Sequence, residues 1–363
     1  MGGGTPDDGE ISAGAPLLAR ALDRTGVTGL APTARLPVDL GPLAWYALAV
    51  VAVELVGLQG YRLVTGQVLT FVQNPLWLLR PLVLLGAALA TEQLYRRYDR
   101  ALVRSNVESR VADPDRFDGL VPDRLTALLV ALGVGFTVVN AAVVLTVPQL
   151  YAAGGATRVV RFLVVTPFGY VPVLASFLAT YVAVEVVLPR RIAAADVPLD
   201  YLDPERLGGM RPVGELLKLA YYYLMVGLVA YAVATYGPYV LGGAFAYRAL
   251  DAPGLAVNAL FTAVWLLAVG VMAAGIYVLH QHMARQKRER LYELDRRARD
   301  HVDDPWDIRS FDALDPPPEY QRYRKRVELV TATKEYPATF TMWSQLVVGV
   351  VLPKALQLVL AAA

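Results

Sequence analysis

Long apolar runs separated by short charged segments dominate the chain from residue 42 to its end. Seven runs exceed the roughly 18 residues that a helix needs to cross a bilayer. Because the backbone in lipid must satisfy its own hydrogen bonds, each run predicts a membrane-spanning helix. The chain is therefore predicted to be an all-α, polytopic membrane protein, with spans over residues 42–62, 75–95, 125–150, 159–188, 216–245, 255–279 and 340–360.

The last third of the chain departs from a simple alternation of spans and loops. The sixth apolar run continues without a break into a charged helical stretch over residues 281–302, and a Pro-rich turn leads to a second helical stretch over 319–336. A narrow apolar stripe on a charged helix usually meets another helix. We therefore expect a helical anchor whose contacts come from a stripe on each stretch: Leu291, Leu294, Ala298, Tyr323 and Val327.

Lysine and arginine are distributed unequally between the two sets of loops. The loops after the second, fourth and sixth spans are rich in arginine, whereas the opposite loops hold only Arg62, Arg158, Arg161 and Arg248. Basic loops tend to stay in the cytoplasm. The pattern predicts a cytoplasmic N-terminus, an external C-terminus, and a last helix split into a cytoplasmic half and a membrane half.

This orientation divides the chain into four parts. Residues 1–40 are polar and rich in glycine and proline, and are expected to be a disordered cytoplasmic tail with a short amphipathic helix over 16–24. Residues 41–280 are expected to form a bundle of six spans. Residues 281–337 are the predicted cytoplasmic anchor, and residues 338–363 are the final span.

Composition narrows the function further. Hydrophobic residues make up 56% of the chain and the mean hydropathy is +0.42, which points to the cell membrane. A net charge of +2 indicates no nucleic-acid partner, and the absence of cysteine excludes disulfides and thiolate metal sites. Only five of the 34 basic residues are lysine, a bias that suggests a high-GC genome, and aspartate is abundant in the loops, which suggests a halophile; an archaeal source is therefore expected. No nucleotide, redox or hydrolase motif occurs, so neither an enzyme nor a cofactor is expected.

Two charged residues lie inside the first pair of spans. At 1.5 Å per residue, Glu54 lies ~12 Å and Arg80 ~8 Å below the outer ends of their helices. Lone charges in lipid are costly, so these two residues should pair or face water. The pair is either a gating or ion-path element, or a salt bridge that locks a helical hairpin.

Residues 166–172 of the fourth span contain two prolines and one glycine, which free backbone carbonyls and kink a helix. Broken helices in transporters often mark binding sites; the other interpretation is a tolerated kink. Aromatic residues near this break suggest an outer-half ligand pocket, with ordinary packing as the alternative. The pocket residues would be Asn140, Phe168, Tyr170, Tyr231, Tyr236 and Trp265.

Several polar residues lie along the seventh span, so this helix either lines a pore or buries its polar side chains in a bundle. Lys354 either faces a pore or extends to the interface. The predicted pore-lining residues are Thr341, Gln345, Val350, Lys354 and Gln357.

Other ionisable residues lie outside these candidate sites. Glu92 and Glu185 lie near inner helix ends and are expected to reach cytoplasmic water. His280 and His282 have the wrong helical spacing for a shared metal.

The order of spans and the helical anchor resemble the seven-transmembrane ion channel superfamily that includes insect odorant and gustatory receptors. The resemblance is one of topology over residues 42–360. The gustatory pattern on the last helix is Thr-Tyr, five hydrophobic residues, then Gln-Phe. Residues 339–346 here read Thr-Phe-Thr-Met-Trp-Ser-Gln-Leu, with a spacer one residue shorter and two polar residues inside it. The resemblance implies a homotetramer around a shared pore, gated by a small-molecule ligand.

Three other functions fit the same sequence. A secondary transporter is suggested by the broken fourth span and by Glu54 and Arg80. A retinal-based light sensor would use a lysine on the seventh helix, but the third span has no carboxylate to serve as its counterion. A membrane scaffold would use the cytoplasmic helices to bind a partner.

Overall fold

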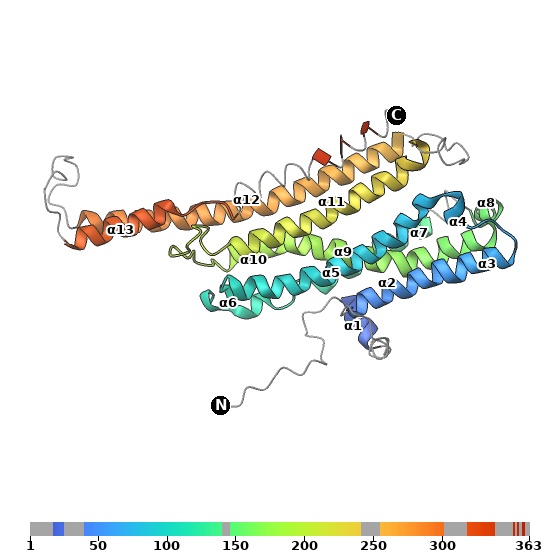
Figure 1. The fold of residues 1–363 in the computed structure, drawn as a ribbon. Coiled ribbons are helices and arrows are strands. Elements are labelled where there is room, and N and C mark those ends of the chain that lie inside the picture. The colour runs from blue at the N-terminus through green and yellow to red at the C-terminus, as the bar shows by residue number, and fades with distance from the viewer. Residues whose placement is uncertain are drawn as a thin grey trace.

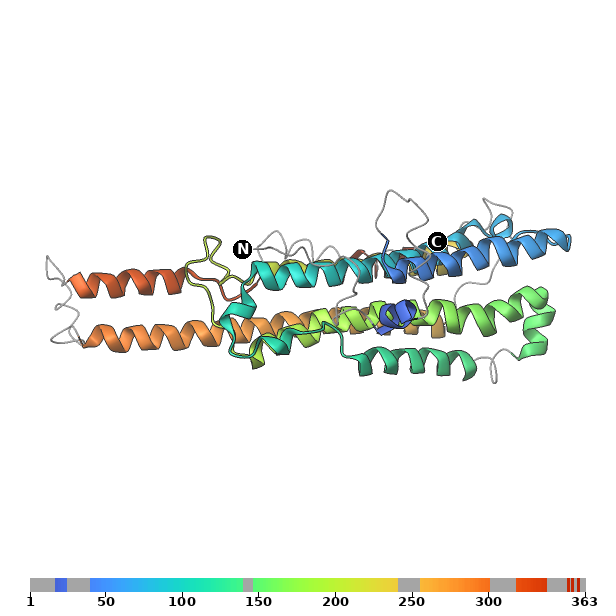
Figure 2. The ribbon, with the colours of Figure 1, turned by 90° about the horizontal axis from the view of Figure 1, so that it is seen from below.

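The computed structural model describes residues 17–24, 40–139, 146–240, 255–300 and 318–337, with Val351, Leu352, Lys354, Ala355, Leu358 and Val359. These residues are 85% helical and include no strand. The long helices run side by side along one axis (Figures 1 and 2). Five residues of the predicted sites lie outside the described residues. They are the predicted pore-lining residues Thr341, Gln345, Val350 and Gln357, and the predicted pocket residue Asn140.

Five helices in the described part of the chain are long and apolar enough to cross a membrane. They correspond to the first, second, fourth, fifth and sixth predicted spans. Their ranges are Pro42–Val64 (α2 Pro42–Ala52, η2 Val53–Leu58, α3 Gln59–Val64), Pro75–Arg104 (η3 Pro75–Leu78, α5 Leu79–Arg104), Gly154–Ala194, Arg211–Pro238 within α11 (Arg211–Val240), and Asn258–Arg299 within α12 (Leu255–Arg299).

The third predicted span is divided between two helices. Helix α7 (Asp123–Val139) is 17 residues long, and a new helix, α8 (Val147–Val160), starts at a capping box formed by Thr146 and Gln149. A capping box satisfies the free N–H groups of a first helical turn and marks a helix start. The apolar run over residues 125–150 therefore does not form one continuous helix, although its hydropathy predicts one.

The fourth span is a continuous helix with two wide turns. After α8 it passes through η6 (Arg161–Tyr170), α9 (Val171–Val182), η7 (Ala183–Val187) and α10 (Leu188–Ala194), and η6 and η7 are π-helical. Proline has no N–H to donate, so Pro167 and Pro172 interrupt the hydrogen-bond ladder without ending the helix. The Tyr46 hydroxyl donates to the carbonyl of Phe168, which compensates for part of this loss.

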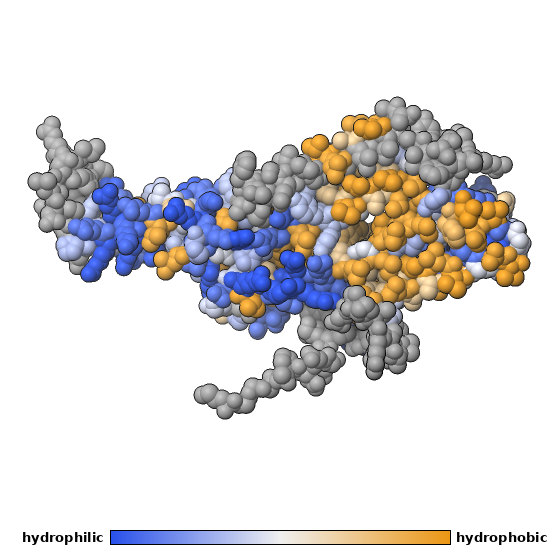
Figure 3. Space-filling model, in the orientation of Figure 1, coloured by the Kyte–Doolittle hydropathy of each residue, from blue (hydrophilic) through white to orange (hydrophobic). Residues whose placement is uncertain are grey.

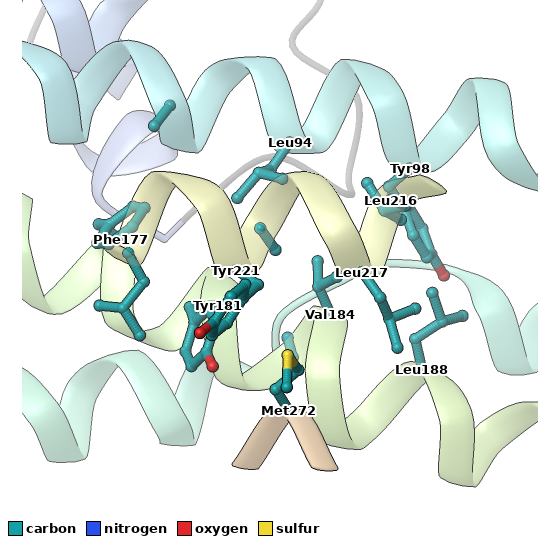
Figure 4. Packing of buried hydrophobic residues seen from close by; sticks show 14 of the residues in the cluster. Leu94, Tyr98, Phe177, Tyr181, Val184, Leu188, Leu216, Leu217, Tyr221 and Met272 are labelled. Atoms are coloured by element: carbon teal, nitrogen blue, oxygen red, sulfur yellow. The ribbon is translucent and has the colours of Figure 1, made fainter. Parts of the chain in front are cut away.

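The core lies where α5, α9 and α11 pack together. Leu94 and Tyr98 from α5, Phe177 from α9, and Leu216 and Tyr221 from α11 interdigitate there (Figure 4). The short helix α1 (Leu17–Arg24) packs its apolar side against α2 and α9. In Figure 3 the face shown is apolar over the half of the molecule that holds α2 and α3, and hydrophilic toward α13. A band of this kind is what a bilayer would cover.

Two carboxylates expected near inner helix ends have different surroundings in the structure. Glu92 accepts the N–H groups of Gly41 and Ala44 at 3.0 Å each, so it caps the first turn of α2 from another helix. Glu185 on η7 is completely buried. The expectation that Glu185 reaches water is wrong, because α11 and α12 pack over this turn of the helix.

Helix α12 is 45 residues long and continues unbroken from its apolar part into the charged stretch. Helix α13 (Pro318–Ala332) packs back along it (Figure 1). Leu294 and Val330 are buried in this hairpin, and the remaining predicted contacts Leu291, Ala298, Tyr323 and Val327 are half-buried. The apolar stripe on α12 is therefore covered by α13 of the same chain.

Candidate functional site

One cavity in the described part of the chain is unusually rich in arginine. It has a volume of about 280 Å³ and lies where α3, α4 (Thr70–Gln73), α5, α8 and η6 meet. Four of its ten lining residues are arginines and none is acidic. The lining residues are Leu58, Gln59, Arg62, Thr70, Gln73, Arg80, Gly154, Thr157, Arg158 and Arg161.

Hydrogen bonds between α3 and α4 fix one wall of the cavity. Gln59 accepts the backbone N–H of Thr70 at 2.8 Å and donates to the Thr70 hydroxyl at 3.1 Å. Arg62 donates to the same hydroxyl at 2.7 Å, while its buried Nε atom has no hydrogen-bond partner. The turn between the two helices is thereby held closed, and Arg62 keeps an unused donor beside the cavity.

The opposite wall depends on a kink at Gly154 and Gly155. Gly155 has φ +67°, a conformation that suits glycine, and a Cβ on Gly154 would lie 2.9 Å from the Arg158 side chain. The helix that follows this kink presents Arg158 and Arg161 to the cavity. The Arg161 guanidinium lies 5.1 Å from the centre of the Trp77 ring, a cation–π contact that orients it.

Glu54 is completely buried next to the cavity and binds two groups of η6. Arg161 Nε lies 2.8 Å from Glu54 Oε1, an ion pair without the linear geometry of a hydrogen bond. The Tyr170 hydroxyl donates to the other carboxylate oxygen. The partner predicted for Glu54 was Arg80, but Arg80 lines the cavity instead. Hydropathy gives the depth of a charged residue along its span. It does not give the neighbouring helix toward which the charged side chain points.

The charges around the cavity do not balance. Glu54 is paired with Arg161, whereas Arg62 and Arg80 form no ion pair with any residue that the structure describes. Guanidinium groups hold carboxylate and phosphate oxygens in bidentate fashion. The arrangement can therefore bind an anion with several oxygen atoms.

The residues predicted to form a ligand pocket divide into two groups. Tyr170 binds Glu54 and Phe168 is 64% exposed, both on η6. On α11, the Tyr231 ring stacks on Phe261 of α12, and the buried Tyr236 hydroxyl donates to Asn258 at 2.5 Å. Trp265 is half-buried against the core on α12. Packing and side-chain hydrogen bonds account for most of these aromatic side chains.

Lys354 is the predicted pore-lining residue that the structure describes. Its ammonium group donates to the Thr262 hydroxyl on α12 at 2.8 Å. His280 and His282 contact different carbonyls, of Glu335 and Val197. The described residues contain no cluster of three metal-ligating side chains.

Three of the cavity arginines appeared in the sequence as isolated charges of external loops. In the sequence, Arg62, Arg158 and Arg161 bear only on the orientation in the membrane. A usable signal was present: they are three of the four basic residues on that side, and Arg62 lies between the two spans that carry Glu54 and Arg80. Their convergence depends on the kink at Gly155 and on the packing of η6 against α2, which the sequence does not encode in a local pattern.

Comparison of the chain with protein-family models, curated proteins and solved structures gives no match.

Proposed function

We propose that this protein is a multi-pass membrane transport protein that binds a small oxyanion in the arginine-lined cavity. One observation carries the proposal: four arginines from three separate helices line a cavity whose surface includes no acidic residue. Glu54 pairs with Arg161, but Arg62 and Arg80 add further positive charges beside this pair, which is costly in the absence of a ligand. An anion would offset that repulsion.

The size and lining of the cavity define the ligand class. Small-molecule sites typically enclose ~300–1,000 Å³, so a cavity of about 280 Å³ suits a ligand of a few heavy atoms. Gln59, Thr70 and Gln73 add neutral hydrogen-bonding groups beside the arginines. This combination suits a small carboxylate, phosphate or sulfate.

The neighbouring helix favours transport over simple binding. The cavity lies against η6, where two prolines and a π-helical stretch interrupt the span. Interrupted helices commonly form the sites of secondary transporters, and π-turns concentrate at functional sites. In the orientation proposed from the loop arginines, with the N-terminus in the cytoplasm, the cavity lies at the external end of the bundle.

Calorimetric titration of the purified protein in nanodiscs with inorganic phosphate, sulfate and citrate tests the proposal. At least one of these anions should bind, and the Arg62→Gln/Arg80→Gln variant should weaken its binding at least tenfold. A double variant of Arg97 and Arg100 is the matched control, because these two arginines line a groove elsewhere on α5. Binding of no anion, or equal loss in both variants, would overturn the proposal.

A homotetrameric ion channel is the second candidate. In the 18-residue apolar window of α12, 28% is buried within the described chain, against 39–61% in the other four spans, so this helix offers surface to lipid or to a neighbouring subunit. Its pore would be lined by the last span, from Thr341 to Gln357. Mass photometry and planar-bilayer recording test it together. A monomer that accumulates anions in liposomes without single-channel conductance would exclude it.

A further inference from the structure

The carboxyl group of Glu185 is buried without a partner. Its exposed fraction is 0%, and neither oxygen has a hydrogen-bond partner among the described protein atoms. It lies on η7, in the same 41-residue helix that carries Arg161 and Tyr170 at its other end. Ionisable residues inside a membrane bundle are costly to keep and commonly mark ion or proton paths.

The groups that face Glu185 are neutral on every helix packed against it. Helix α11 contributes the Tyr221 hydroxyl, which is also buried and without a partner, and α9 contributes Tyr181, whose hydroxyl donates to the Ala268 carbonyl at 3.0 Å. Helix α12 contributes the backbone of Gly275, and α10 contributes apolar side chains. Figure 4 shows the two tyrosines close together, with Val184 nearby.

Helix α12 packs directly against the main chain of this turn. A Cβ atom on Gly275 would lie 2.0 Å from the backbone carbonyl oxygen of Glu185. An ionised carboxylate here would have no counter-charge among the described residues, and burying an unpaired charge is strongly unfavourable. A neutral acid, in contrast, can share a hydrogen bond with a phenol.

We propose that Glu185 is a proton-binding site inside the helix bundle, with the Tyr221 hydroxyl as its hydrogen-bond partner. On protonation of Glu185, a proton from water forms an O–H bond with one carboxylate oxygen. On deprotonation, that bond breaks and the proton returns to water. One interrupted helix links this site to the arginine-lined cavity through η6 and η7. Proton binding would therefore accompany anion movement, a coupling that rests on the proposed function, whereas protonation itself does not.

Infrared spectroscopy of the full chain in nanodiscs tests the protonation. At neutral pH the wild-type protein should show the carbonyl band of a protonated carboxyl group, shifted in D₂O and absent from Glu185→Gln. Glu215→Gln is the matched control: Glu215 is on α11, is 40% exposed and pairs with Arg211, so its removal should cost only carboxylate bands. Loss of a carboxylate band from Glu185→Gln would overturn the proposal.

A second variant covers the case in which Glu185→Gln does not fold. Tyr221→Phe removes the proposed partner and leaves the acid in place, so it should shift the frequency of the same carbonyl band. An unchanged frequency would exclude Tyr221 as the partner. A wild-type spectrum with no protonated-carboxyl band would overturn the proposal without any variant.

Anion uptake into proteoliposomes under an inward proton gradient tests the coupling. Glu185→Gln should bind the anion within twofold of wild type and lose at least tenfold of the gradient-driven accumulation. Full gradient-driven accumulation by this variant would overturn the coupling. If wild-type protein binds no anion at all, the proposed function fails, and the infrared result still decides whether Glu185 carries a proton.

Discussion

The ion pair of Glu54 and Arg161 joins two spans at a buried point. Glu54 is completely buried and the Arg161 side chain is 23% exposed. Removing one member of a buried pair leaves the other charge uncompensated, whereas removing both can be nearly neutral. A single substitution therefore overstates the net contribution of the ion pair to the free energy of unfolding, because it also leaves an unpaired charge.

Glu54→Gln should lower the free energy of unfolding by roughly 3–5 kcal/mol, because Arg161 is left without its counter-charge. Glu54→Gln combined with Arg161→Met should recover most of that loss. Thermal unfolding in detergent, analysed as a double-mutant cycle, gives the coupling energy. Strictly additive effects of the two substitutions would contradict the ion pair as the source of the stability.

The close contact between α12 and η7 requires a residue without a side chain at the contact point. Gly275 of α12 lies against the backbone of η7, while Gly270, on the same helix, has open space around its Cα. The two positions differ in surroundings and not in helical propensity.

Gly275→Ala should destabilise the protein by about 1–3 kcal/mol, because the added methyl group collides with a backbone carbonyl that cannot rotate away. Gly270→Ala is the matched control and should be neutral or stabilising by roughly 0.5–1 kcal/mol, since alanine favours a helix. The unfolding midpoints of the two variants in the same detergent provide the comparison. Equal destabilisation would show that the α12 contact is not what requires glycine.

The hairpin of α12 and α13 is a local unit with its own small core. Leu294 is 1% exposed and Val330 3% exposed, and Lys287 donates to the Thr333 carbonyl at 2.8 Å. We therefore expect the hairpin to open without disturbing the spans.

Leu294→Ala should release α13, because truncating a buried leucine costs about 2–5 kcal/mol and few other apolar contacts hold this helix. Hydrogen–deuterium exchange should accelerate across residues 318–332 and remain unchanged in α5 and α9. Tyr292→Ala is the control, since Tyr292 is 73% exposed. Acceleration throughout the bundle would mean that the hairpin and the spans unfold together.

At the scale of the whole molecule, the loop arginines set the expected orientation in the membrane. The chain has no cysteine, so single cysteines report cleanly on accessibility. Gln67 lies in the turn between α3 and α4, and Ser109 lies on α6 (Val107–Arg110), after the arginine-rich end of α5. Replacing each of them by cysteine gives one probe at each end of the bundle.

A membrane-impermeant maleimide should label Gln67→Cys in intact cells and Ser109→Cys only after permeabilisation. Arginine-rich segments are retained in the cytoplasm, which is the reason for this expectation. Labelling of Ser109→Cys alone in intact cells would reverse the proposed orientation and put the arginine-lined cavity on the cytoplasmic side.

Hydropathy alone was sufficient to predict an all-helical membrane protein. Five of the predicted spans coincide with helices long enough to cross a membrane, and the continuity of α12 and the short helix α1 also follow from local pattern. The sequence pattern did not predict that the third span is divided at Thr146. The residues of this capping box lie inside an apolar run, and hydropathy alone predicts that the helix continues through them. The seventh predicted span lies mostly outside the described residues.

The sequence by itself determined where helices form and how deep each charge lies along them, because both depend on residues close together in the chain. Only the tertiary structure decided which groups meet. Arg161 rather than Arg80 binds Glu54, four distant arginines share one cavity, and Glu185 is sealed between α11 and α12. The physical reason is that helix rotation, π-turns and glycine contacts set these pairings, and each arises from packing between segments far apart in the sequence.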